Sequence, residues 1–338
     1  MKRSAGLRSP KTWFLIVLLA FVGSSTARSE TAKVALQYGV TYLPLSVMQQ
    51  EKLWEKHSKA NGVELSVEWT VLGSGGAVND AIISGSVDIA AGGIAPMMKL
   101  WDRTRESMRV KGIAALNSTS ITLIANRDDI RTLADFKPND RISVPIQKVS
   151  YDAVIIQMAA AKLFGAKSFD RLDSQTVAMK HPDAVTALLS PRSPISAYFA
   201  VSPFREKVLK QPGMHKVIDS YEVLGGPGTF SAVWAAESFV KNKAAVYKAF
   251  IAALDEANQR IQKDKASAVD AHIKVTNTNA DDRALLLGIV EDPTNVYTMT
   301  PQNTLYFADF LAQTGFLDKK PVSWKEYFFE GIHDRGGS

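Results

Sequence analysis

The sequence contains no cysteine, which excludes a disulfide framework, a thiolate metal site and a thiol nucleophile. Its five histidines are scattered, and no two have the spacing of metal ligands. A Walker A motif, a Gly-x-Ser-x-Gly elbow, an HExxH motif and an EF-hand loop are also missing. We therefore predict no catalytic residue, no metal and no cofactor.

A strong charge of one sign is absent from most of the chain. The formal net charge is +6, and four of these charges lie within the first 27 residues, at Lys2, Arg3, Arg8 and Lys11. Those residues include no Asp or Glu, so the remainder carries only +2. Such a small excess does not indicate nucleic-acid binding.

Long apolar runs are missing after the N-terminal segment. The run from Trp13 to Val22 follows basic residues and precedes Ser25-Thr26-Ala27. This order is typical of a secretory signal peptide cleaved after Ala27. The alternative is a membrane anchor, which needs ~20 apolar residues and so is disfavoured. We predict a signal peptide at residues 1–27 and an exported, soluble, unlipidated protein in the periplasm.

The residues that follow the predicted signal peptide are more than a single hydrophobic core usually includes, so two lobes are expected. Strand-like and helix-like stretches alternate, which predicts an α/β fold with mostly parallel strands. Residues 63–70 alternate polar and apolar side chains and predict an edge strand. The pattern also predicts helices at 44–56 and 151–164, and a linker at 221–228.

A glycine-rich turn, Gly73-Ser74-Gly75-Gly76, lies between a predicted strand and a predicted helix at 77–83. Such a turn presents free backbone N–H groups at the positive end of the helix dipole, which suits a small anion. Val78 occupies the third glycine position of the dinucleotide fingerprint, so that motif is excluded. The alternative is a tight strand–helix turn with no ligand.

A second helix start follows a strand at residues 144–151, with Ser150 placed as its N-cap. Ser150 either caps only its own helix or contributes to a second anion-facing site. Two such starts facing each other would form a pocket at the carboxyl ends of strands. Aromatic residues near strand ends could wall this pocket or belong to the core; they are Tyr38, Tyr42, Tyr151, Phe199, Phe204 and Phe230.

Several short motifs together resemble the nitrate/sulfonate/taurine-type solute-binding proteins of ABC importers. They lie, in order, at residues 36–39, 42–44, 73–75, 83–89, 95–96, 130–136 and 141–145. The resemblance implies a type II periplasmic binding protein fold, in which two α/β lobes are joined by two crossing segments. Residues 28–118 and 226–338 would form lobe 1, and residues 119–225 lobe 2. It also implies a monomer that delivers its solute to an inner-membrane ABC permease.

The expected ligand is a small organic anion with an apolar or aromatic body. Taurine-type members can offer a carboxylate to an amine on the return strand, where this chain has Thr229-Phe230-Ser231, so an amine is disfavoured. The expected ligand contacts are Tyr38, Thr41, Tyr42, Ser74, Gly75, Gly76, Gly93, Ile94, Asn117, Val149, Ser150, Tyr151, Phe199, Ser202, Thr229 and Phe230. Two other functions stay open: a periplasmic sensing module, and an enzyme related to a pyrimidine-precursor synthase, whose cysteine motif is missing here.

Overall fold

The computed structural model describes Met1 and residues 28–338. The predicted signal peptide at 1–27 therefore lies, apart from Met1, outside the described residues. Within the described part of the chain, no helix is both long enough and apolar enough to cross a bilayer.

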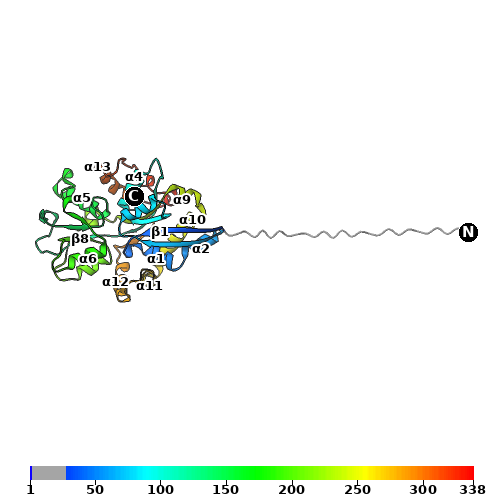
Figure 1. The fold of residues 1–338 in the computed structure, drawn as a ribbon, viewed down its shortest axis with the longest axis horizontal. Coiled ribbons are helices and arrows are strands. Elements are labelled where there is room, and N and C mark those ends of the chain that lie inside the picture. The colour runs from blue at the N-terminus through cyan, green and yellow to red at the C-terminus, as the bar shows by residue number, and fades with distance from the viewer. Residues whose placement is uncertain (2–27) are drawn as a thin grey trace.

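Two β-sheets organise the chain (Figure 1). The first has six strands in the order β11-β4-β10-β3-β1-β2. These strands are β1 (Arg28–Leu36), β2 (Val63–Val71), β3 (Ile89–Gly93), β4 (Lys111–Ser118), β10 (Thr229–Ala235) and β11 (Val296–Tyr297). The edge position predicted for residues 63–70 is confirmed, because β2 ends this order and alternates buried and exposed side chains.

The second sheet has five strands in the order β7-β6-β8-β5-β9. They are β5 (Thr122–Ala125), β6 (Ile142–Val144), β7 (Thr176–Ala178), β8 (Ala197–Ala200) and β9 (His215–Asp219). We call the parts built around the two sheets the first half and the second half. The chain crosses between them after β4 and again between β9 and β10.

The prediction of mostly parallel strands is wrong, because the pairing is mixed. Strand β1 is parallel to β2 and β3, and β6 is parallel to β7 and β8. Strand β10 returns from the second half and inserts antiparallel between β3 and β4. Strand β5 is antiparallel to both of its neighbours, and β11 is antiparallel to β4.

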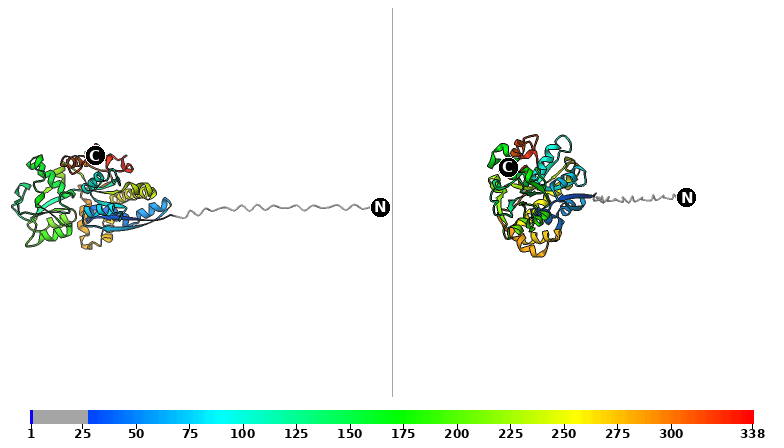
Figure 2. Two further views of the ribbon diagram at one scale, coloured as in Figure 1. Left: turned by 45° about the horizontal axis from the view of Figure 1, so that its top comes forward. Right: turned by 60° about the vertical axis from the view of Figure 1, so that its left-hand side comes forward.

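Helices cover the sheets in both halves (Figures 1 and 2). In the first half they are α1 (Leu43–Gln50), α2 (Leu53–Ala60), α3 (Gly75–Ile83), α4 (Ile94–Arg103), α9 (Glu237–Asn242), α10 (Ala244–Lys263), α11 (Lys265–Thr276), α12 (Arg283–Glu291) and α13 (Thr304–Gln313). In the second half they are α5 (Tyr151–Phe164), α6 (His181–Leu189), α7 (Phe204–Leu209) and α8 (Ser220–Leu224). Short 3-10 turns complete the chain, at Val40–Tyr42 (η1), Leu133–Asp135 (η2), Ala166–Ser168 (η3), Asp173–Gln175 (η4), Ala280–Asp282 (η5), Trp324–Glu326 (η6) and Glu330–Ile332 (η7).

Two predicted elements need correction. The single helix expected at 44–56 is two helices, α1 and α2, because Lys52 adopts a left-handed conformation between them (φ 50°). The linker expected at 221–228 begins as a helix, α8, since Asp219 and Glu222 form a capping box at its start. That helix ends at Gly225, whose φ of 78° is readily adopted only by glycine.

A continuous apolar core links the two halves rather than stopping at each sheet. In the first half, Trp54 of α2 packs edge-on against Phe250 of α10, with ring centroids 4.9 Å apart. Its indole N–H donates a 2.9 Å hydrogen bond to the Val246 carbonyl. This packing fixes α2 and α10 and leaves the carboxyl ends of β1 and β3 facing the second half.

Candidate functional site

A small cavity lies where the two halves meet, at the carboxyl ends of β1, β3 and β6. Its volume is about 20 Å³, room for roughly one water molecule, so the halves are closed upon each other. It is lined by Gln37, Tyr38, Tyr42, Gly75, Gly93, Pro96, Pro145, Ser150, Tyr151, Asp152, His181 and Phe230. The first half and the second half both contribute lining residues.

The two predicted helix starts meet at this cavity. Ser74 accepts a 3.3 Å hydrogen bond from the Ala77 N–H at the start of α3. Ser150 accepts a matching 3.3 Å bond from the Ala153 N–H at the start of α5. Each serine thus caps its own helix. The backbone N–H groups that precede Ala77 and Ala153 in each first turn lie at the positive end of the helix dipole.

Glycine at position 75 is required by close packing. A Cβ atom there would lie 2.7 Å from Pro96 Cγ at the start of α4. The backbone of α3 therefore approaches Pro96, another lining residue, more closely than a larger residue would allow.

Aromatic rings from both halves pack together beside the helix starts. The ring of Tyr151, the first residue of α5, lies edge-on to Phe230 of β10 at 5.2 Å and stacks on Phe307 of α13 at 5.1 Å. On the opposite wall, the Tyr42 hydroxyl donates a 3.4 Å hydrogen bond to Gln37 Oε1. Tyr151 thus makes aromatic contacts from the second half to two residues of the first half.

Asp152, the second residue of α5, is one of the residues that line the cavity. The residue is only 3% exposed, and its Oδ1 has no hydrogen-bond partner among the described residues. Burial raises the pKa of the Asp152 carboxyl to about 7. Sequence reasoning did not select Asp152, because an acid in a first helical turn is normally explained by the helix dipole.

His181, the first residue of α6, also lines the cavity and is buried. Its Nδ1 lies 2.7 Å from the Tyr198 hydroxyl of β8, and its ring stacks on Phe204 at 5.9 Å. Burial lowers the pKa of His181 to about 4, so the imidazole is neutral at pH 7. The cavity therefore has polar walls without a lysine or an arginine among its lining residues.

The predicted contacts fall into three groups. Those that line this cavity are Tyr38, Tyr42, Gly75, Gly93, Ser150, Tyr151 and Phe230. Those that line a separate cavity of about 10 Å³, between η1, β4 and β11, are Thr41, Asn117 and Ser202. Those outside the lining of both are Ser74, Gly76, Ile94, Val149, Phe199 and Thr229.

Some residues of the last two groups use their polar atoms within the protein. Asn117 donates 2.6 Å hydrogen bonds to the Thr41 carbonyl and to the Ser231 hydroxyl. The Thr229 hydroxyl accepts a bond from the Gln302 N–H, and Phe199 is fully buried in β8. Besides Asp152 and His181, the lining residues that sequence reasoning missed are Gln37, Pro96 and Pro145.

A neighbouring cavity of about 320 Å³ shares Gln37, Tyr38 and Tyr42 with the first. Its other walls include Trp69 of β2 and Phe204 of α7, so it also borders both halves. Its lining is mostly apolar but includes the polar side chains of Lys207 and His272. It offers volume for a solute body beside the polar site.

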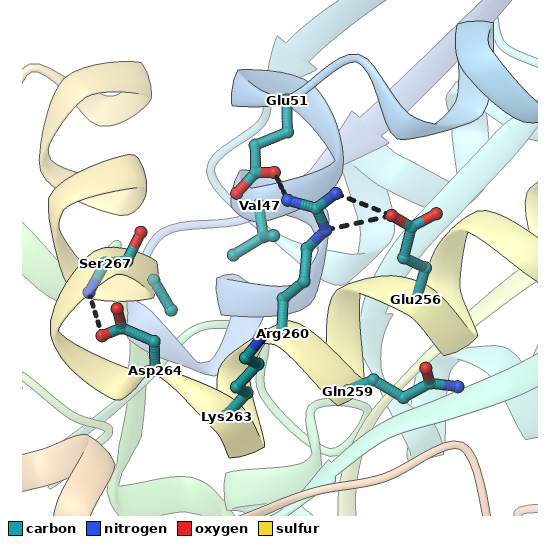
Figure 3. Close-up of a pocket in the computed structure, with 9 residues that line it drawn as sticks. Val47, Glu51, Glu256, Gln259, Arg260, Lys263, Asp264 and Ser267 are labelled. Carbon is teal, nitrogen blue, oxygen red and sulfur yellow. Dashed lines mark hydrogen bonds and ion pairs between the residues drawn. The ribbon is translucent and has the colours of Figure 1, made fainter.

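A third cavity, of about 460 Å³, lies on the first half between α1, α10 and α11 (Figure 3). Arg260 points between Glu51 and Glu256 and forms ion pairs with both. These charges are already paired, and the groove lies away from the strand ends. Among the described residues, no group of three His, Asp or Glu side chains could hold a metal ion.

Comparisons with known proteins identify the fold. No curated protein matches the sequence at a significant level. Among solved structures, the alkanesulfonate-binding protein SsuA from Xanthomonas axonopodis pv. citri, bound to MOPS, superposes with a TM-score of 0.69 at 16% identity, covering 90% of this chain and 99% of that one. The aliphatic sulphonate binding protein SsuA from Escherichia coli gives 0.63 at 17% identity, covering 86% and 94%.

The nitrate-binding protein NrtA from Synechocystis PCC 6803 gives a TM-score of 0.66 at 14% identity, covering 88% of this chain and 84% of that one. These names denote binding proteins and not enzymes. The chain thus has the periplasmic binding protein fold, and its resemblance to the nitrate/sulfonate/taurine-type proteins is confirmed. A model of the NMT1-like family matches residues 25–275, and the chain therefore belongs to the NMT1-like family.

Proposed function

We propose that this protein is the periplasmic solute-binding component of an ABC importer. It captures a small organic anion between lobe 1 (residues 28–118 and 226–338) and lobe 2 (residues 119–225). It then delivers the solute, as a monomer, to a permease in the inner membrane. Residues 1–27 act as the export signal and are removed.

The observation that carries this proposal is the meeting of two helix starts at one cavity. Gly75 of α3 comes from lobe 1, and Ser150 and Tyr151 come from lobe 2. The N–H groups of a first helical turn favour negative charge, and two such turns aimed at one point reinforce each other. Oxygen atoms of a carboxylate or sulfonate suit these donors.

The walls suit the rest of such a solute. The rings of Tyr42, Tyr151 and Phe230 line the small cavity and can cover an apolar body. The adjoining 320 Å³ cavity gives space for a larger body. The similar fold of SsuA, which was solved with MOPS bound, accommodates an organic sulfonate.

Binding and closure are coupled in this proposal. The chain crosses between the lobes twice, which permits a hinge motion. Closure brings the ring of Tyr151 into contact with the rings of Phe230 and Phe307. It also excludes water from the site. A solute that contacts both lobes stabilises the closed form, which the permease then recognises.

A thermal-shift screen tests the proposal. The protein is unfolded and refolded to remove any carried solute, then tested with carboxylates, sulfonates and neutral analogues. An organic anion that binds the folded state must raise the melting temperature. If only solutes without an anionic group raise it, the anion site is wrong, and turnover of a bound solute would indicate an enzyme instead.

A pair of variants links binding to the cavity. Alanine at Gly75 places its methyl group against Pro96 and displaces the start of α3, so it should weaken binding. Alanine at Gly288, in α12, meets no atom within 4 Å and should leave affinity unchanged. Equal affinities of the two variants would place the solute elsewhere.

A further inference from the structure

The carboxylate of Asp152 has no obvious role in a site that binds only anions. Asp152 is only 3% exposed and lines the cavity between the lobes. Its Oδ1 has no hydrogen-bond partner in the described part of the chain. A buried polar atom without a partner lowers stability, and a negative charge there repels an anion. An external partner would remove both costs.

Among the described residues, no lysine, arginine or other cation contributes to the charge environment of the Asp152 carboxyl. The cavity lining contains no lysine or arginine, and His181 is held neutral because burial lowers its pKa to about 4. Burial and the negative charge of Asp152 raise the pKa of Tyr42 and Tyr198 above the ordinary value. The titratable neighbours of Asp152 are Tyr42 of η1, Tyr198 of β8, His181 of α6 and Tyr151 of α5 itself. Within this group of five side chains, only Asp152 changes charge near neutral pH.

Comparison with another first-turn acid shows that the helix dipole is an insufficient explanation. Asp183 occupies the first turn of α6, and its side chain is exposed to solvent. A carboxylate that only complements a dipole gains that benefit at the surface, without loss of hydration. Asp152 is instead held inside the interface between the lobes, where a bound solute would contact it.

We propose that Asp152 is a specificity-determining residue that pairs with a cationic nitrogen group, an ammonium or an amidinium, on the solute. This rests on the proposed function, in which the anionic end of the same solute lies at the start of α3. It reverses the expectation from residues 229–231 that an amine is disfavoured, because Asp152 offers the carboxylate that this strand lacks. The rings of Tyr42, Tyr151 and Phe230 line the same cavity, and aromatic faces favour a cation. The charge-assisted bond satisfies the unpartnered Oδ1.

The inference is tested with matched solutes that differ only in charged groups. Benzoate carries the anion, benzamidine the cation, and para-amidinobenzoate both; propionate, propylamine and β-alanine form an aliphatic set. Calorimetry on refolded mature protein gives each affinity. Solutes carrying both groups should bind about 10- to 100-fold more tightly than the anions alone, the range expected for a hydrogen bond to a charged group.

Two variants and a pH profile complete the test. Asp152→Asn should remove the advantage of the amidinium, and Asp183→Asn should retain it. In the wild-type protein, affinity for para-amidinobenzoate should rise about tenfold between pH 6 and pH 8, as the Asp152 carboxyl with a pKa of about 7 ionises. The pH profile is measured on the wild-type protein, so it tests the inference even if Asp152→Asn folds poorly.

The outcomes separate this inference from the proposed function. If benzoate or propionate binds best, and binds more tightly to Asp152→Asn, the inference is overturned and the importer role stands. If only benzamidine or propylamine binds, the assignment of Asp152 stands and the anionic solute is wrong. If no member of either set binds, both are rejected.

Discussion

Lys207 Nζ lies 2.6 Å from a carboxylate oxygen of Asp282, and this ion pair joins the two halves of the molecule. Lys207 belongs to α7 in the second half, and Asp282 ends η5 in the first half. Both side chains are partly exposed, at 41% and 23%. A pair with this exposure contributes ~0–1 kcal/mol, so it favours closure without preventing the halves from opening.

Replacing Lys207 by methionine should therefore weaken solute binding modestly. The substitution keeps most of the side-chain stem and removes the charge, so the closed form loses up to ~1 kcal/mol, or about fivefold in affinity. Calorimetry measures the affinity, and small-angle scattering of the solute-free protein measures the opening. High salt should shrink the difference from wild type.

Lys216→Met is the matched control for this ion pair. Lys216 pairs with Asp219 and Glu222, which all belong to the second half, so its loss leaves the interface between the halves unchanged. An equal loss of affinity in both variants would show that Lys207 acts through general charge. Because Lys207 also lines the 320 Å³ cavity, the scattering of the solute-free protein separates an effect on closure from a lost contact with the solute.

Gly112 of β4 should not tolerate a side chain. A Cβ atom there would overlap Phe328 and lie 3.0 Å from Met97 Sδ. The strand is fixed at this point, because the Gly112 N–H donates 2.8 Å to the Tyr327 carbonyl. Gly112→Ala should lower the free energy of unfolding by about 1–3 kcal/mol, measured by urea titration.

The contrasting substitution, Gly288→Ala, should have the opposite sign. Gly288 lies in α12, where an added Cβ meets no atom within 4 Å. Alanine in a helix interior is favoured over glycine by up to ~1 kcal/mol. A loss of stability in Gly288→Ala would mean that the surroundings of α12 are tighter than described.

Local patterns in the sequence predicted many elements well. The expected helix at 151–164 coincides with α5, because apolar periodicity and the Ser150 cap mark the same start. The expected edge strand at 63–70 coincides with β2, which is one residue longer. Strand direction was not predictable in the same way. Strand β10 is buried throughout, and a strand buried on both faces carries no signal of whether its neighbours are parallel.

The candidate site was only partly visible in the sequence. The two helix starts stood out because glycine and serine have local conformational roles. Asp152 and His181 did not, since an acid in a first turn and a histidine before Pro182 have ordinary surface explanations. The burial of His181 depends on its packing against Tyr198 and Phe204, which lie far from it in the sequence or on another element, and that of Asp152 on the packing around α5. No local pattern encodes these contacts.

His272 should make the protein less stable in acid. The residue is buried in α11, its Nδ1 lies 2.8 Å from the Ser46 hydroxyl, and burial lowers its pKa to about 4. The unfolded chain, with an ordinary histidine pKa of about 6.5, binds more protons in this window. Stability is therefore complete above about pH 6.5 and falls as the pH drops towards 4.

Urea titrations across this window, with His272→Gln, check the assignment. The variant should show a shallower fall in the free energy of unfolding between about pH 6.5 and pH 4, because it removes one of the buried imidazoles. Parallel wild-type and His272→Gln curves would exclude this histidine as a source of acid sensitivity.

Asp152 should act on stability with the opposite pH dependence. Burial raises the pKa of its carboxyl to about 7 in the folded protein, above the ordinary value of 3.8. The folded state thus binds more protons than the unfolded state between these values. The contribution to stability is fully present below about pH 4 and is lost as the pH rises through about 7.

Asp152→Asn, which stays neutral, should therefore become more stable relative to wild type as the pH rises. The gain should be small near pH 4 and reach an upper limit of ~4 kcal/mol above pH 8, since each pKa unit corresponds to about 1.4 kcal/mol. Asp183→Asn, at an exposed position, should show no such rise. A gain in Asp152→Asn that is the same at every pH would mean that the carboxyl does not titrate in this range, and that its environment in solution already holds a partner. A gain that grows with pH, together with loss of binding to amidinium solutes, would show that this side chain lowers stability at the position where it confers recognition.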